Sequence, residues 1–194
     1  MRALAASLVA IALFTVVLGF GYPALMTGFA AVTFHAKSTG SLIHRNGRVI
    51  GSALTAQAFT TPRYFHERPS ATSPAYNAAG TTFSDLGPTS PALARLVRRN
   101  AQAILTLERP YNPGLTIRRV PVDAVVPSGS GVDPQISPAY AQLQARRVAA
   151  VRHLPLATVQ KLIEQHTAGR VLGFFGEPGV NVLKLNVALD ELGG

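Results

Sequence analysis

The sequence contains no cysteine among its 194 residues. This absence excludes disulfide frameworks, thiolate zinc sites, iron–sulfur clusters and cysteine nucleophiles together. Charged residues are also scarce, at 14% of the chain, compared with roughly 25% in an average soluble domain. Such a chain, with a mean hydropathy of +0.23, is too apolar for a disordered protein or a nucleic-acid-binding tail. We therefore expect no nucleic-acid partner.

Hydrophobic residues make up 47% of the chain. A chain of this length suits one modest domain together with an apolar segment and argues against a two-domain soluble enzyme. The apolar segment lies at the start, because the 32 positions from Ala3 to Phe34 contain no Asp, Glu, Lys, Arg or His. Its densest part, residues 4–22, would span roughly 28 Å as a helix. The sequence therefore predicts one transmembrane helix.

A cleaved signal peptide is the alternative interpretation of this segment. The apolar run is longer than the roughly 7 to 15 residues typical of signal peptides, and no clean A-x-A site follows it. A retained anchor is therefore favoured, and we predict an anchor over residues 1–34 and an extracytoplasmic domain over residues 35–194. The protein is expected in the cell (inner) membrane, single-pass, in contact with the lipid bilayer.

The orientation of the anchor rests on few charges. Only the amino terminus and Arg2 precede the apolar run, and long domains translocate largely regardless of charge. A cytoplasmic N-terminus is therefore preferred, although Lys37, Arg45 and Arg48 lie just beyond the run. Residues 35–194 carry 17 basic and 9 acidic side chains. This excess favours anionic lipid headgroups or an acidic partner, or it serves solubility alone.

The domain is expected to mix strands and helices. A hairpin is predicted around Arg45-Asn46-Gly47. Residues 61–91 form a long loop that is either ordered or disordered, and order is favoured because Tyr64, Phe65, Tyr76 and Phe83 can pack down. Ser-Pro pairs at Ser90 and Ser137 predict helices that end before Pro110 and near Leu154. The other expected elements are a strand over 120–126, a helix over 157–167, a turn at 176–179 and an apolar run over 180–185. The fold class is α+β, with a small mixed α/β domain after the helix.

The first candidate site is the run Ser128-Gly129-Ser130-Gly131. Consecutive backbone N–H groups ahead of a helix attract anions, so the run is a candidate phosphate-binding loop. It lacks the lysine and the spacing of a P-loop, and it does not match G-x-G-x-x-G. A tight turn is the favoured interpretation.

The second candidate lies in the helix predicted to follow Ser137. Gln144 and Arg147 fall on its apolar face, whereas Arg146 and Arg152 point elsewhere. A buried arginine needs a partner, and we expect Asp133 or the carbonyl groups of residues 128–134 to provide it. The alternatives are contact with a partner protein and ligand binding.

Other chemistry is not indicated. The five histidines show no metal-ligand spacing, and neither a G-x-S-x-G motif nor a carboxylate pair stands out. We therefore expect no catalytic residue, no metal site and no enzyme activity of the chain alone, although a site assembled from distant residues stays open. Within the apolar segment, Gly19, Gly21 and Gly28 permit close helix packing. Incidental lipid-facing glycines are the alternative.

The chain resembles the C subunit of the Kdp potassium-transporting ATPase, the KdpC family, along essentially its whole length. The matching motifs, in chain order, are Tyr22-Pro23, Thr27-Gly28, Gly47-Arg48-Val49-Ile50-Gly51-Ser52, Tyr64-Phe65-His66, Arg68-Pro69-Ser70-Ala71-Thr72, Leu86-Gly87-Pro88-Thr89, Ser128-Gly129-Ser130-Gly131, Asp133-Pro134, Ile136-Ser137-Pro138, Gln144, Arg147-Val148-Ala149, Gly176-Glu177-Pro178, Val180-Asn181-Val182-Leu183 and Leu185-Asn186. The chain departs from the family at Glu67, where Gly is usual, at Asp85 and Ser90, where Asn is usual, and at Ala145-Arg146, where Val-Pro is usual.

The resemblance implies an accessory subunit of a high-affinity, ATP-driven potassium uptake complex. Its partners would be a channel-like potassium-binding subunit and a P-type ATPase subunit, whose ATP affinity it would raise as a catalytic chaperone. ATP then acts in the complex, with no cofactor bound directly by this chain. A domain outside the membrane requires coupling through the membrane subunits, whereas a domain inside would permit nucleotide contact at residues 128–131. The alternative function is a stand-alone, membrane-tethered extracytoplasmic binding protein or enzyme.

Overall fold

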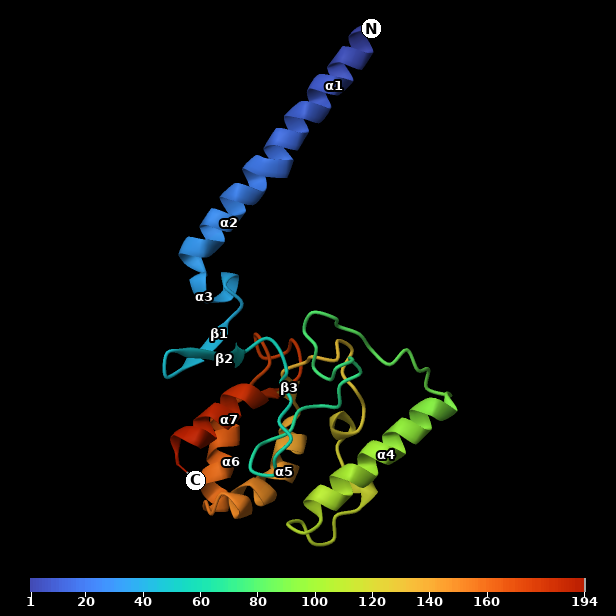
Figure 1. Cartoon of the computed structure of the whole chain (residues 1–194), viewed down its shortest axis with the longest axis vertical. Coiled ribbons are helices and arrows are strands. Elements are labelled where there is room, and N and C mark those ends of the chain that lie inside the picture. Colours follow the sequence, from blue (N-terminus) through green and yellow to red (C-terminus); the bar gives the residue numbers. More distant parts are fainter. Residues whose placement is uncertain (194) are drawn as a thin grey trace. The chain divides into compact units, whose positions relative to one another are not determined.

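The computed structural model describes residues 1–193. The chain divides into two compact units, Met1–Leu42 and Ile43–Gly194, and each is described by itself. The fold combines an N-terminal apolar helix with a mixture of helices and short strands (Figure 1). The predicted α+β class is therefore confirmed.

The first unit is almost entirely helical. It contains α1 (Arg2–Phe14), the π-helical segment η1 (Thr15–Gly21), α2 (Tyr22–Thr33) and the short α3 (His35–Ser38). Residues 2–33 form one continuous helix whose length and composition would allow it to cross a membrane. The widened turn of η1 directly precedes Pro23, whose ring lacks an N–H group and clashes with the preceding turn. The irregular part of the helix, residues 15–21, is thus the turn before Tyr22-Pro23.

The predicted hairpin is confirmed. Strands β1 (Leu42–Arg45) and β2 (Arg48–Ser52) pair with each other and are joined by Asn46 and Gly47. Both linking residues have positive φ angles, 49° and 73°. Two such residues define the turn that matches the twist of paired strands, and this requirement explains the Asn-Gly sequence.

Helix α4 (Pro91–Glu108) begins where the Ser-Pro signal predicts. The Ser90 hydroxyl accepts a hydrogen bond from the Ala92 N–H at 3.3 Å. The buried or half-buried side chains follow helical spacing, whereas Arg95, Arg98 and Arg99 are exposed. The helix ends before Pro110, because a proline cannot continue the hydrogen-bonding pattern.

The prediction of a strand over residues 120–126 is wrong. This segment instead follows η2 (Ile117–Arg119) and contains η3 (Val122–Ala124), both short 3-10 helices. Pro121 cannot donate a ladder hydrogen bond, and the backbone bonds close locally, for example from the Val125 N–H to the Val122 carbonyl at 3.0 Å. The Asp123 carboxylate binds the Ser137 N–H at 2.7 Å and so caps the region before α5.

The rest of the domain is a three-stranded antiparallel sheet and three helices. The sheet has the order β3-β5-β4, with β3 (Gln135–Ile136), β5 (Gly179–Asn181) and β4 (Thr167–Ala168). Ile136 and Thr167 both pair with Val180. The helices are α5 (Pro138–Val151), α6 (Leu156–Gln165) and α7 (Val182–Glu191). The predicted helices at α5 and α6 are confirmed to within a few residues at their ends.

The core lies where α5, α6 and α7 gather (Figure 1). Fully buried members include Tyr140, Val148, Ile163 and Leu185. Phe65 joins them from the long loop, as predicted for that residue. Phe83 is 58% exposed, so the expectation that it packs down is wrong.

Candidate functional site

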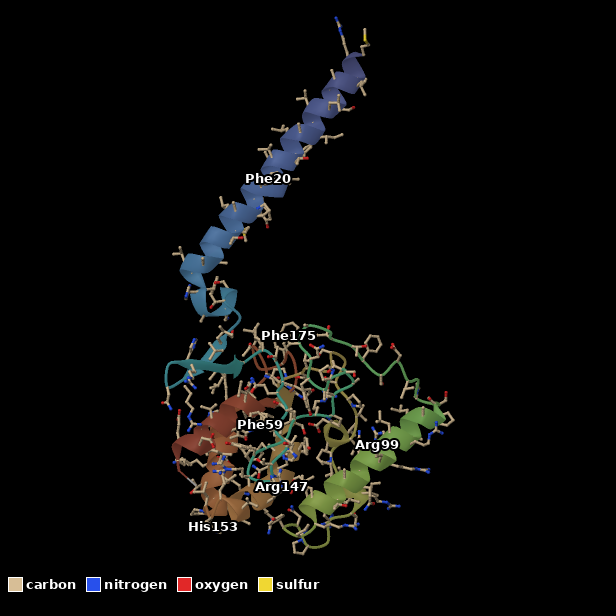
Figure 2. All side chains as sticks on the ribbon, viewed as in Figure 1. Phe20, Phe59, Arg99, Arg147, His153 and Phe175 are labelled. Carbon is tan, nitrogen blue, oxygen red and sulfur yellow. The ribbon has the colours of Figure 1, made fainter. Side chains whose placement is uncertain are left out.

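Helix α5 places Gln144 and Arg147 one turn apart on its buried face. Both side chains have 0% exposure, and Figure 2 shows Arg147 within the folded domain, whereas Arg99 on α4 points outward. Ser137 fixes the start of α5, because its hydroxyl accepts a hydrogen bond from the Tyr140 N–H at 3.0 Å. The predicted burial of the two residues is therefore observed.

The partner predicted for Arg147 is wrong. Its Nε donates to Oε1 of Glu108 at 2.8 Å, and Glu108 also has 0% exposure. Asp133 instead accepts hydrogen bonds from Arg68 at 3.3 Å and from the Gln135 N–H at 3.0 Å. The acid lies 39 positions before the arginine, on a different helix, so sequence proximity pointed to the wrong carboxylate.

A signal for Glu108 was nevertheless present in the sequence. It follows Ala101 and Ile104 at helical spacing and so continues the apolar stripe of α4. An acid on one apolar stripe and an arginine on another are candidates to pair when the two helices pack. Burial raises the pKa of Glu108, while the charge of Arg147 and its hydrogen bond oppose this rise.

The remaining donors of Arg147 hold an extended segment of the loop. We call residues 62–66 the clamped segment. Nη1 of Arg147 donates to the carbonyl of Pro62 and to that of Tyr64, the latter at 2.9 Å. Nη2 donates to Oε1 of Gln144 at 2.8 Å, which orients the amide.

Two side-chain amides complete the hold on the clamped segment. Gln144 accepts from the His66 N–H at 2.7 Å and donates to the His66 carbonyl at 3.1 Å. Asn186 of α7 accepts a hydrogen bond from the Phe65 N–H at 2.9 Å and donates one to the Phe65 carbonyl at 3.0 Å. These amides take the place of a neighbouring strand and satisfy backbone groups that would otherwise be buried without partners. The role of Asn186 was missed by the sequence analysis.

Arg152 also differs from its prediction. It was expected to point away from the buried face, yet it is 3% exposed. Its guanidinium pairs with Asp190 at 2.6 Å and donates to the Arg63 carbonyl at 2.7 Å. The reason is that this side of α5 is also covered, because Arg63 of the clamped segment and Leu189 and Asp190 of α7 supply acceptors for the guanidinium. Burial raises the pKa of Asp190, but hydrogen bonds from Arg152, Arg45 and Tyr64 outweigh it and the pKa is lowered.

The run Ser128-Gly129-Ser130-Gly131 is a tight turn packed against the long loop. The Gly131 N–H bonds to the Ser128 carbonyl at 3.4 Å, and the Val132 N–H bonds to the Ser130 hydroxyl at 3.2 Å. Gly131 has φ +72°, and a Cβ there would lie 2.8 Å from the Thr82 carbonyl oxygen. Because these two amides are already hydrogen-bonded, they are not free to cradle a phosphate.

Taken together, these contacts build a framework in which charges and amides are matched to backbone groups. Within residues 1–193, no group of three or more His, Asp or Glu side chains lies close enough to hold a metal ion. The arrangement rigidly positions the clamped segment against α5 and α7. The contacts of this site therefore serve a structural role, because they hold the clamped segment in place on the domain.

An apolar helix that is long enough to cross a membrane, followed by a small α+β domain, is typical of proteins with a single N-terminal membrane anchor. A family model described as "K+-transporting ATPase, c chain" matches residues 4–191. The chain therefore belongs to the KdpC family, which confirms the resemblance seen in its motifs, and it is a membrane-associated potassium-transport subunit.

Curated relatives cover nearly the whole chain. The potassium-transporting ATPase KdpC subunit of Methylococcus capsulatus is 49% identical over 187 residues, 96% of each chain. That of Gemmatimonas aurantiaca is 48% identical over 193 residues, covering 99% of this chain and 94% of the relative. That of Burkholderia vietnamiensis is 50% identical over 184 residues, covering 94% and 93%.

Proposed function

We propose that this chain is a non-catalytic accessory subunit of an ATP-driven potassium uptake complex. It assembles with a channel-like potassium-binding subunit and a P-type ATPase subunit, and it raises the ATP affinity of the latter. The observation that carries this proposal is the family match over residues 4–191. The relatives are named as subunits of a potassium-transporting ATPase, and a subunit requires partners.

The single apolar helix supports an accessory role. An ion path through a membrane needs several helices and polar groups that face a cavity. Residues 2–33 provide one candidate span, and its interior lacks charged side chains. We therefore assign the ion path and the ATP hydrolysis to the partner subunits.

The proposed orientation places the N-terminus in the cytoplasm and the domain outside it. ATP is cytoplasmic, so the effect on ATP affinity is transmitted through the membrane subunits. In agreement with this indirect route, the Gly131 amide of the turn and the Val132 amide after it are engaged within the domain, which leaves fewer donors for a phosphate. No nucleotide is bound by this chain itself in the proposal.

Copurification tests the assembly. Tagged full-length chain, solubilised in mild detergent from potassium-starved cells, is expected to bring down the P-type ATPase and channel-like subunits. An unrelated single-span protein with the same tag is the control. Recovery of the chain without either partner would overturn the proposal in favour of a stand-alone tethered protein. In the recovered complex, removal of the chain is expected to raise the KM for ATP.

The glycines of the helix are proposed to form the packing seam. A Cβ at Gly28 would meet no atom within 4 Å, and one at Gly21 would approach only the Val16 carbonyl oxygen, at 3.5 Å. The helix itself therefore tolerates larger side chains there. Replacing both glycines by Leu is expected to reduce the yield of complex about tenfold, because a partner helix could no longer approach closely.

Ala6→Leu is the matched control for this change. It also introduces a leucine, near the other end of the span, and the complex yield should match that of the unaltered chain. Yield is measured as partner recovered per unit of tagged chain. An unchanged yield for Gly21→Leu/Gly28→Leu contradicts the seam and supports incidental, lipid-facing glycines.

A further inference from the structure

The loop that joins β4 to β5 exposes a cluster of large apolar side chains. We call residues 170–177 the apolar loop. Val171, Leu172, Phe174 and Phe175 are 68%, 80%, 66% and 59% exposed, and Figure 2 shows Phe175 at the edge of the domain. Scattered exposed apolar residues are ordinary, but four within five positions mark a contact surface.

The apolar loop is ordered in this exposed conformation. Val171 and Phe175 form an antiparallel bridge, with both N–H···O distances 2.9 Å. Leu172 has φ +53°, a conformation that is unfavourable for a side chain of this kind. The rings of Phe174 and Phe175 lie 4.2 Å apart between centroids. The bridge therefore closes the loop, and the loop holds its apolar side chains in exposed positions.

Four backbone N–H groups of the apolar loop, those of Val171, Gly173, Phe174 and Phe175, are hydrogen-bonded within it. Besides the bridge, the Gly173 N–H bonds to the Arg170 carbonyl at 3.2 Å, and the Phe174 N–H bonds to the Val171 carbonyl at 3.3 Å. Arg170 pairs with Glu177 through both carboxylate oxygens, at 3.0 and 2.8 Å. Each backbone group that is hydrogen-bonded within the loop lowers the cost of entering the interfacial region of a bilayer.

The linker after the helix and the charge of the domain both favour a contact with the bilayer. Its anchor helix ends at Thr33 and β1 begins at Leu42, so the linker extends at most about 30 Å. Residues 35–194 carry 17 basic and 9 acidic side chains, which favours anionic headgroups. We infer that the apolar loop inserts into the interfacial region of the phospholipid bilayer that holds the anchor, as a second membrane contact beyond the proposed subunit role.

Tryptophan fluorescence tests this contact, because the sequence contains no tryptophan. Phe174→Trp gives the full-length chain a single reporter in the apolar loop. Phe83→Trp is the matched control, since Phe83 is 58% exposed in a different loop. Both variants are reconstituted into vesicles of phosphatidylcholine and phosphatidylglycerol, with and without brominated acyl chains. The Phe174→Trp variant is expected to emit at shorter wavelength and to be quenched at least about threefold more than the Phe83→Trp variant.

A second variant tests whether the quenching depends on an apolar tip of the loop. Leu172→Asp in the Phe174→Trp background places a charge at the tip and should abolish most of the quenching. Circular dichroism should be unchanged, because Leu172 is 80% exposed. Equal, water-like emission and equal quenching of the two single-tryptophan variants would overturn the inference. Shielding of the reporter in the apolar loop only after addition of the partner subunits would also overturn it, in favour of a protein contact. Copurification remains a separate test of the subunit role.

Discussion

Arg147→Ala is expected to lower the free energy of unfolding by about 3 to 5 kcal/mol, because it leaves the Glu108 carboxylate buried without a compensating charge. The salt bridge is 2.8 Å long and both side chains have 0% exposure. The same substitution removes the donors that bind the carbonyls of Pro62 and Tyr64. The clamped segment would then lose part of its attachment to α5, which adds to the effect.

Arg146→Ala is the matched control for this substitution. Arg146 is the preceding residue of the same helix and is exposed, so its removal should change the stability by no more than about 0.5 kcal/mol. Urea unfolding of the full-length chain in mild detergent, followed by circular dichroism, measures both variants. Equal midpoints would contradict the structural role. Unchanged stability together with lower potassium-stimulated ATPase activity of the complex would instead make Arg147 a subunit contact.

Local signals in the sequence predicted much of the secondary structure. Ser90 and Ser137 each precede a proline and cap a helix in the structure. Asn46 and Gly47 form the hairpin turn for the reason anticipated, since both adopt positive φ. Such features depend on a few adjacent residues. These features can therefore be predicted from the sequence without knowledge of the tertiary fold.

The candidate site was predicted only in part. Helical spacing placed Gln144 and Arg147 on the buried face of α5, but their partners come from α4 and from residues 62–66. Helical spacing can mark a charge on an apolar stripe, but a single sequence does not say which of these charges meet through tertiary packing. The expected strand over 120–126 failed for a related reason. Its β-branched residues suited a strand, whereas Pro121 and the capping contact of Asp123 fixed the local 3-10 conformation.

Glu67 is a second buried acid, and its environment differs from that of Glu108. Glu67 is 4% exposed, and neither carboxylate oxygen has a hydrogen-bond partner among residues 1–193. Its pKa is raised to about 8, mainly by burial, with an opposing effect of the Gln57 backbone and an additional rise from Asp133. Tyr76 stays neutral nearby, because burial and Glu67 raise its pKa to about 12. Burial thus favours the protonated, neutral form of Glu67 at pH 7.

This raised pKa makes the stability fall with rising pH. Between the unfolded pKa near 4.5 and the folded pKa of about 8, the folded chain keeps a proton that the unfolded chain has lost. The contribution is complete below about pH 4.5 and decreases by about 1.4 kcal/mol per pH unit up to about pH 8. The total is roughly 3 to 5 kcal/mol. Glu67→Gln removes the titration and should therefore be the more stable form at pH 8.

The difference in unfolding free energy between Glu67→Gln and the unaltered chain isolates this effect. His66, whose pKa is lowered mainly by burial, and Asp190 titrate in both chains and so cancel to first order. The difference should be near zero at pH 4.5 and should grow to several kcal/mol at pH 8, as measured by urea midpoints. Glu164→Gln, at an exposed position of α6, should show no such growth. A constant difference across this range would mean that the Glu67 carboxyl ionises in the folded chain much as it does in the unfolded one.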